Sequence, residues 1–163
     1  MLITLKNKEF LIIDEFIFKC AVGKSGIVLN KKEGDNATPS GTFSLGSLYY
    51  REDRVTKPLT KITTKIIKKN MGWCDDPKSK HYNKEILINK KIEHEKLFKK
   101  DNSYNYLIVI KYNYKKTIPY KGSAIFIHLT TNYKKTAGCI SLKEKDFLVL
   151  TKLLTKKTKI KIN

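Results

Sequence analysis

The sequence has few arginines, few cysteines and no long apolar run, and each shortage excludes a class of protein. No stretch approaches the roughly 18 apolar residues that a membrane-spanning helix needs. The N-terminal segment MLITLKNKEFLIIDEF is broken by charged side chains and lacks the continuous apolar region of a signal peptide. We therefore expect neither a membrane span nor a leader, and the residues alone leave the location of the protein open.

The three cysteines, Cys20, Cys74 and Cys139, are odd in number and include no C-x-x-C pair. This argues against a disulfide framework, although a single Cys20–Cys74 bridge stays open. A zinc site formed by Cys74, His81 and Cys139 would lack any standard ligand spacing. We therefore expect no metal site.

The formal net charge of +19 comes from 34 basic residues, of which only Arg51 and Arg54 are arginine. The lysines are scattered as doublets, and the chain has no arginine-rich helix, zinc finger or aromatic RNA-binding signature. This distribution favours a solvated lysine surface over a specific nucleic-acid site. The charge still favours anionic partners, and a carboxylate-rich polymer suits it as well as DNA does.

Apolar runs of strand length recur along the chain and predict a β-rich α+β fold, with a mixed-sheet or β-sandwich core and a few short helices. Residues 1–163 show no linker or repeat, so we expect one domain. The expected strands are 1–6, 10–14, 16–22, 45–50, 106–112, 123–129 and 158–162.

Local signals predict helices and turns between these strands. Ser141-Leu-Lys-Glu144 matches a capping box, and Phe147, Leu150 and Leu154 follow at the spacing of an amphipathic helix that ends near Thr155. A second short helix is expected over Glu93–Lys100. Thr38-Pro-Ser-Gly41 suits a type I turn.

The stretch HLTTNYKKTAGCIS, from His128 to Ser141, holds the residues that could do chemistry. A free thiol needs a nearby base or a positive potential to become nucleophilic. His128 ends an apolar strand, and the polar segment 130–136 can bring Cys139 back beside it. We then expect a depressed pKa for Cys139, and amides at Gly138 and Cys139 that could bind an oxyanion. Spacing alone leaves a second interpretation open, because a cysteine between apolar residues is more often a core thiol.

The order of these residues resembles the L,D-transpeptidase catalytic domain, or YkuD-like family. The family signature is a strand that ends in His, a variable loop and Ser/Thr-x-Gly-Cys, matched here by SAIFIHL and Thr136-Ala-Gly-Cys139. A second motif, TPxGxF, is matched within ATPSGTF at residues 37–43. Asp146 falls where the family often has an acidic residue in its last helix. The resemblance runs from about Gly23 to the C-terminus.

The resemblance implies that Cys139 is the nucleophile and His128 the proton acceptor and donor. The thiolate would attack a peptidoglycan stem peptide between an L-centre and a D-residue, and an amine or water would resolve the thioester. No cofactor is implied, and the family role would place the protein in the cell envelope. We expect a monomer with no membrane span and no specific nucleic-acid partner. Residues considered for substrate binding are Thr136, Trp73, Asp75 and Arg54, although Trp73 is equally consistent with a buried side chain.

Two positions depart from the family pattern. Ala137 stands where many members have His, and Ser141 where many have Arg. A substrate carboxylate would then need another cation, for which the candidates are Lys121, Lys134, Arg51 and Arg54. These departures keep a rival open, namely a non-enzymatic basic domain on a degenerate catalytic fold that binds an anionic polymer, either cell wall or nucleic acid.

Overall fold

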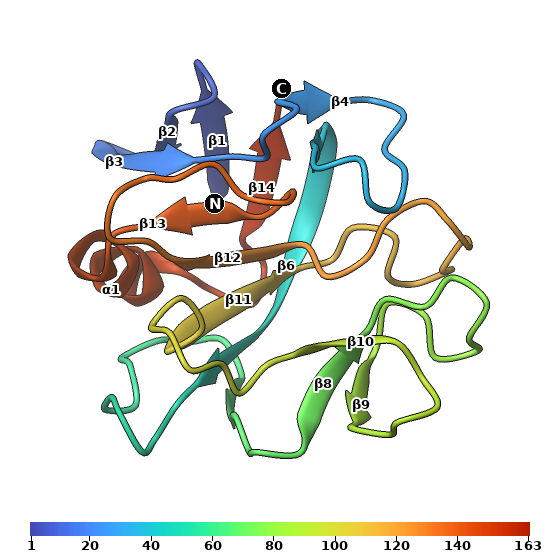
Figure 1. Cartoon of the computed structure of the whole chain (residues 1–163). Coiled ribbons are helices and arrows are strands. Elements are labelled where there is room, and N and C mark those ends of the chain that lie inside the picture. The colour runs from blue at the N-terminus through green and yellow to red at the C-terminus, as the bar shows by residue number, and fades with distance from the viewer.

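The computed structural model describes residues 1–163 and is mostly β, with one α-helix (Figure 1). In chain order the elements are β1 (Leu2–Lys6), β2 (Phe10–Ile13), β3 (Phe16–Ala21), β4 (Ile27–Val28), β5 (Thr38–Pro39), β6 (Gly41–Tyr50), β7 (Thr64–Ile66), β8 (Met71–Cys74), β9 (Glu85–Leu87), β10 (His94–Lys96), β11 (Tyr106–Ile110), β12 (Phe126–Leu129), β13 (Ile140–Leu142), α1 (Glu144–Leu153) and β14 (Lys159–Ile162). All seven strands that the sequence predicts are present, with shifted ends. No helix is long and apolar enough to cross a membrane.

Nine strands form one large mixed sheet in the order β11-β12-β13-β3-β2-β1-β14-β6-β7. Because β11 also pairs with β6, the sheet closes on itself, with β7 outside the closed ring. A three-stranded sheet, β10-β8-β9, lies apart from the ring (Figure 1). The expectation of a β-rich mixed sheet is confirmed. A two-sheet sandwich is not confirmed, and one helix replaces the few that were expected.

Alternation along the strands of the ring divides the buried side chains into two cores. In β11, Tyr106, Ile108 and Ile110 belong to the larger core of 24 residues. Leu107 and Val109 face the other way, into a core of 11 residues shared with β8 and its neighbours. The same alternation holds in the later strands, so that Ile140 lies in the larger core and Cys139 in the smaller one. The candidate site residues therefore lie on the outer face of the ring.

Helix α1 covers the larger core but begins differently from the prediction. Phe147 and Leu150 are fully buried, and the Phe147 ring stacks on Tyr106 at 5.7 Å between centroids. The helix is preceded by Lys143, whose side chain makes no capping hydrogen bond. Ser141 pairs within β13 instead of capping the helix, so the predicted capping box is wrong. Pairing of β13 between two strands outweighs the local capping signal.

Two further predictions are corrected, and one possibility that the sequence left open is settled. Residues 93–100 form no helix, because β10 within them pairs with β8 as an edge strand. Residues 38–41 form no turn: Thr38–Pro39 is the extended strand β5, and the Thr38 hydroxyl accepts a hydrogen bond from Gly23 N–H at 2.9 Å. Cys20 and Cys74 are both buried and free, so they form no bridge.

Candidate active site

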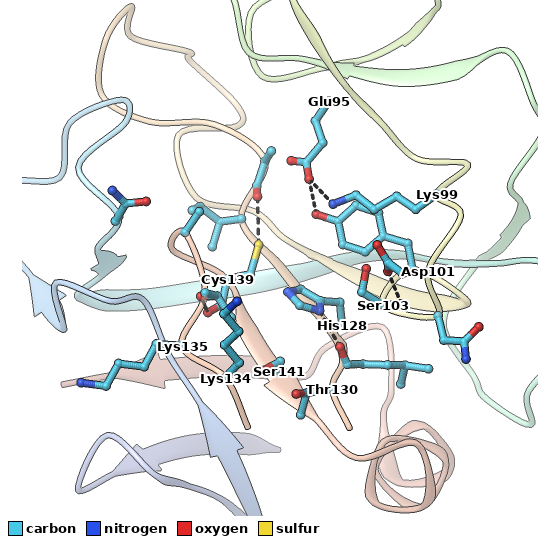
Figure 2. Close-up of a pocket in the computed structure, with 18 of the residues that line it drawn as sticks. Glu95, Lys99, Asp101, Ser103, His128, Thr130, Lys134, Lys135, Cys139 and Ser141 are labelled. Atoms are coloured by element: carbon cyan, nitrogen blue, oxygen red, sulfur yellow. Dashed lines mark hydrogen bonds and ion pairs between the residues drawn. The ribbon is translucent and has the colours of Figure 1, made fainter. Parts of the chain in front are cut away.

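A cavity of about 930 Å³ opens on the outer face of the ring, beside Cys139 and His128 (Figure 2). His128 in β12 and Ser141 in β13 are register partners in a parallel pair, so their side chains share one face. Cys139 comes immediately before β13 and lies two residues from Ser141 on that same face. All three residues line the cavity, together with charged side chains from the loops around 31–36, 95–103 and 130–137.

The two sequence motifs meet at Gly138. This glycine has φ +142°, and a Cβ there would lie 2.8 Å from the carbonyl oxygen of Ala37. Only glycine accommodates both the backbone angle and the close approach. A parallel bridge between Gly23 and Thr136 fixes the neighbouring chain. The 37–43 motif therefore supports the turn that presents Cys139.

Thr136 closes this turn with two hydrogen bonds. Its hydroxyl donates to the carbonyl of Cys139 at 2.6 Å and accepts from the N–H of Gly138 at 3.1 Å. The Gly138 amide is thus occupied, which corrects its expected place as an oxyanion donor. The N–H of Cys139 makes no hydrogen bond within the protein, so it is the amide beside the thiol that can bind an oxyanion.

The thiol of Cys139 is a neutral, hydrogen-bonded group in this structure. The residue is 8% exposed, its S–H donates to the carbonyl of Ala124 at 3.2 Å, and Phe126 N–H donates to the sulfur at 3.3 Å. Burial raises the pKa of the Cys139 thiol to about 12. The expected depressed pKa is therefore wrong. Strand β13 also separates Cys139 from the start of α1, so the helix supplies no activating field.

His128 is arranged as a neutral base. Its Nδ1 lies 2.9 Å from the carbonyl oxygen of Leu129, and since a carbonyl can only accept, Nδ1 carries the proton. Nε2 is then the proton-accepting nitrogen. Burial lowers the pKa of His128 below 6.5, so the ring is uncharged at neutral pH. No hydrogen bond joins the ring to the Cys139 sulfur, which is held by Ala124 and Phe126 instead.

Three linked side chains lie beside His128. The sequence did not predict them. Tyr104 packs against the His128 ring at 5.3 Å between centroids, and its hydroxyl donates to Glu95 at 2.6 Å. Lys99 pairs with the same carboxylate at 2.9 Å and lies over the Tyr104 ring at 3.9 Å (Figure 2). No local pattern marks these residues, because β10 and the loop after it bring them to the site.

The residues predicted to bind substrate are divided by the fold. Thr136 and Asp75 line the cavity. Trp73 does not: it is 2% exposed, packs edge-on against Phe126 at 5.1 Å, and donates its indole N–H to Asn83 at 2.9 Å. Trp73 is therefore a core residue behind the cavity wall, where it cannot touch a ligand.

Of the four cations considered for a substrate carboxylate, only Lys134 lines the cavity. Arg54 donates to the carbonyls of Lys100 and Asp101 at 2.9 and 3.0 Å, so it supports the rim from behind. Arg51 is buried and donates to the carbonyl of Lys99 at 2.7 Å. Lys121 and both arginines lie outside the lining.

Metal-binding side chains are not grouped. Cys74 is buried in β8, and no three His, Cys, Asp or Glu residues lie close enough together to hold a metal ion. The structure therefore does not bring Cys74, His81 and Cys139 together as a zinc site.

Comparison with known proteins gives one clear match. The sequence model of the L,D-transpeptidase catalytic domain, YkuD, matches residues 3–162, which is almost the whole chain. No curated protein matches the chain. The match spans the strands, the cavity and both motifs, and the chain belongs to the L,D-transpeptidase catalytic domain family.

Proposed function

We propose that the protein is a cysteine-dependent L,D-transpeptidase that acts on peptidoglycan stem peptides in cross-linking or remodelling the cell wall. The observation that carries the proposal is the placement of Cys139 and His128 on one face of neighbouring strands, lining a single cavity. The tautomer of His128 supports it, since Nδ1 is committed to Leu129 and Nε2 remains to take a proton. Residues 1–163 act as one catalytic unit, as a monomer.

The reaction starts from a neutral pair. As the thiol attacks the carbonyl carbon between the L-centre and the D-residue, its proton passes to Nε2 of His128. The N–H of Cys139 donates to the oxygen that becomes negative. The C–N bond then breaks, His128 returns the proton to the departing amine, and the acyl group remains on sulfur as a thioester. An amine of a second stem, or water, attacks the thioester with His128 again accepting the proton.

The charged rim supports recognition of a peptide that carries both signs of charge. Lys100, Lys134 and Lys135 line the cavity, and none of the three pairs with a carboxylate. They are the cations available for a substrate carboxylate in place of the arginine that Ser141 replaces. Asp75 and Glu95 also line the cavity, where a substrate ammonium group would be favoured.

The experiment is mass spectrometry of disaccharide-tetrapeptide incubated with the wild type, Cys139→Ala and His128→Ala. Loss of the terminal D-residue, or dimers that lack it, from wild type alone supports the proposal. Monomeric product identifies water as the acceptor, and dimer identifies an amine. Absence of turnover by a protein shown to be folded contradicts it.

A second candidate is a non-enzymatic domain that binds an anionic polymer. The observation that favours it is the charge: only Lys31, Arg51, Lys65 and Lys99 of the 34 basic residues form ion pairs. This candidate predicts polymer binding that weakens steeply with salt, and an unreactive Cys139. Binding without turnover would favour it over the transpeptidase.

A further inference from the structure

Asn83 is a buried side chain, outside the cavity lining, whose hydrogen-bonding groups are all used. Its Oδ1 accepts from Trp73 Nε1–H at 2.9 Å and from the N–H of Ala124 at 3.0 Å. Its Nδ2 donates to the carbonyls of Tyr112 and Asn113 at 3.0 and 2.8 Å. Four such bonds on one buried amide fix its orientation. Asn83 therefore joins three separate segments of chain.

One of those segments carries the partner of the thiol. Ala124 has φ +52°, in the left-handed region that a residue with a Cβ rarely adopts. The peptide N–H of Ala124 is bound by Asn83, while its carbonyl accepts from the S–H of Cys139 at 3.2 Å. Strained backbone of this kind persists only where surrounding contacts hold it, and it is concentrated at functional sites.

The neighbouring residues are held in a similar way. Ser123 donates its hydroxyl to Glu33 at 2.8 Å, and the N–H of Gly122 donates to the Tyr82 hydroxyl at 2.9 Å. These bonds anchor residues 122 and 123, whereas the N–H of Ala124 is held by Asn83 and its carbonyl is bonded by the Cys139 thiol. Asn83 therefore fixes the peptide plane that precedes Ala124, and the left-handed backbone at Ala124 carries its carbonyl from that plane to the thiol.

We propose that Asn83 is a positioning residue for Cys139, acting through Ala124: it holds the left-handed turn that aims the Ala124 carbonyl at the thiol. In the resting protein this contact keeps the hydrogen on sulfur and turns it away from His128. The sulfur is released to His128 when substrate enters, and Asn83 returns it to one fixed position between turnovers. The catalytic part of this inference rests on the proposed function, whereas the control of the thiol does not.

The test uses Asn83→Gly, because glycine accepts the φ of +58° at this position, so the side chain is lost without strain in the backbone. Alkylation of Cys139 by iodoacetamide is followed by peptide mass spectrometry as a function of pH. Loss of the carbonyl partner favours the thiolate, so the pH midpoint is expected to fall by about one unit, and alkylation at fixed pH to rise about tenfold. With tetrapeptide substrate, kcat is expected to fall about tenfold to a hundredfold with little change in KM, because the sulfur is misplaced.

Two further variants keep the test decisive. Thr158→Ala removes a buried hydroxyl that binds Thr155 far from the site, and it controls for lost stability. It should leave the alkylation midpoint unchanged. Ala124→Gly keeps every hydrogen bond and removes one methyl group, so it folds even if Asn83→Gly does not. The freer backbone should lower the midpoint in the same direction by a smaller amount.

The proposal is overturned if folded Asn83→Gly has the wild-type midpoint and kcat, or if Thr158→Ala moves the midpoint as far. It is also overturned if Asn83→Gly does not fold and Ala124→Gly leaves the midpoint unchanged. Failure of the transpeptidase assignment gives a different result, namely no turnover by wild type. The alkylation midpoint would then still test the role of Asn83.

Discussion

Two buried cysteines on opposite faces of the closed ring show what makes a thiol usable. Cys20 in β3 pairs with Leu142 of β13 and points into the larger core, whereas Cys139, just before β13, points into the smaller one. Burial raises the pKa of each thiol to about 12. The two differ in their neighbours, because only Cys139 borders a cavity that also contains a histidine. Burial raises the pKa of both thiols to the same extent. The difference in reactivity that we expect therefore comes from the groups around each thiol.

The largest expected effect separates the two cysteines directly. Cys139→Ala should abolish acyl transfer, because no other group can form the thioester. Cys20→Ala should keep turnover and lose about 1 kcal/mol of unfolding free energy from the small cavity that it leaves. Product analysis and urea denaturation measure the two effects. Turnover by Cys139→Ala would remove the proposed nucleophile.

The next largest expected effect concerns His128, the base that lies in the cavity beside Cys139 and has no counterpart beside Cys20. His128→Gln removes the base but keeps a polar side chain of similar size, and kcat should fall by about 10²–10⁴-fold. Steady-state kinetics with tetrapeptide substrate gives the value, and circular dichroism checks the fold. A loss of less than about threefold would show that another group takes the proton.

The sequence could predict the strands that enclose the larger core more fully than the surroundings of Cys139 on the outer face of the ring. Strands such as Leu2–Lys6 and Tyr106–Ile110 follow from local alternation, which records burial directly. Cys139 and His128 were also accessible from the sequence, through the resemblance of their motif to the transpeptidase family. The capping box at Ser141 failed because strand pairing, which is not local, decided that segment.

The surroundings of the thiol could not be predicted for a related reason. Asn83, Tyr104 and Glu95 belong to segments far from Cys139 in sequence, so no spacing connects them with the thiol. The pKa of Cys139 was predicted in the wrong direction because desolvation depends on tertiary packing. Sequence patterns record which face a residue occupies, but they do not record which partners meet it there.

A pH profile distinguishes a neutral Cys–His pair from an ion pair. Burial places the pKa of His128 below 6.5, and protonation removes the base, so kcat/KM should rise with pH through a midpoint below 6.5. It should then stay level through pH 8 and beyond, since the Cys139 thiol has a pKa of about 12. A midpoint at the ordinary pKa of a thiol would show that the thiolate must form first.

The smallest expected effect concerns Ser141, the register partner of His128 on the outer face of the ring. Ser141 is fully buried, and its hydroxyl has no hydrogen-bond partner. Ser141→Ala removes an unsatisfied group, so the unfolding free energy should rise by about 1 kcal/mol. Urea denaturation measures the change, with Thr151→Ala as the control, because that buried hydroxyl does bond to Leu148 at 2.9 Å. Destabilisation of Ser141→Ala equal to that of the control would show that the hydroxyl has a partner.

The most direct test of the central claim is intact-protein mass spectrometry during turnover of a tetrapeptide donor. We expect a transient adduct with the mass of the donor minus its terminal D-residue, carried as a thioester on Cys139 and absent from Cys139→Ala. We also expect His128→Gln to accumulate the adduct more slowly. Release of the D-residue by folded protein with no adduct at Cys139, or with the same adduct in Cys139→Ala, would contradict the account.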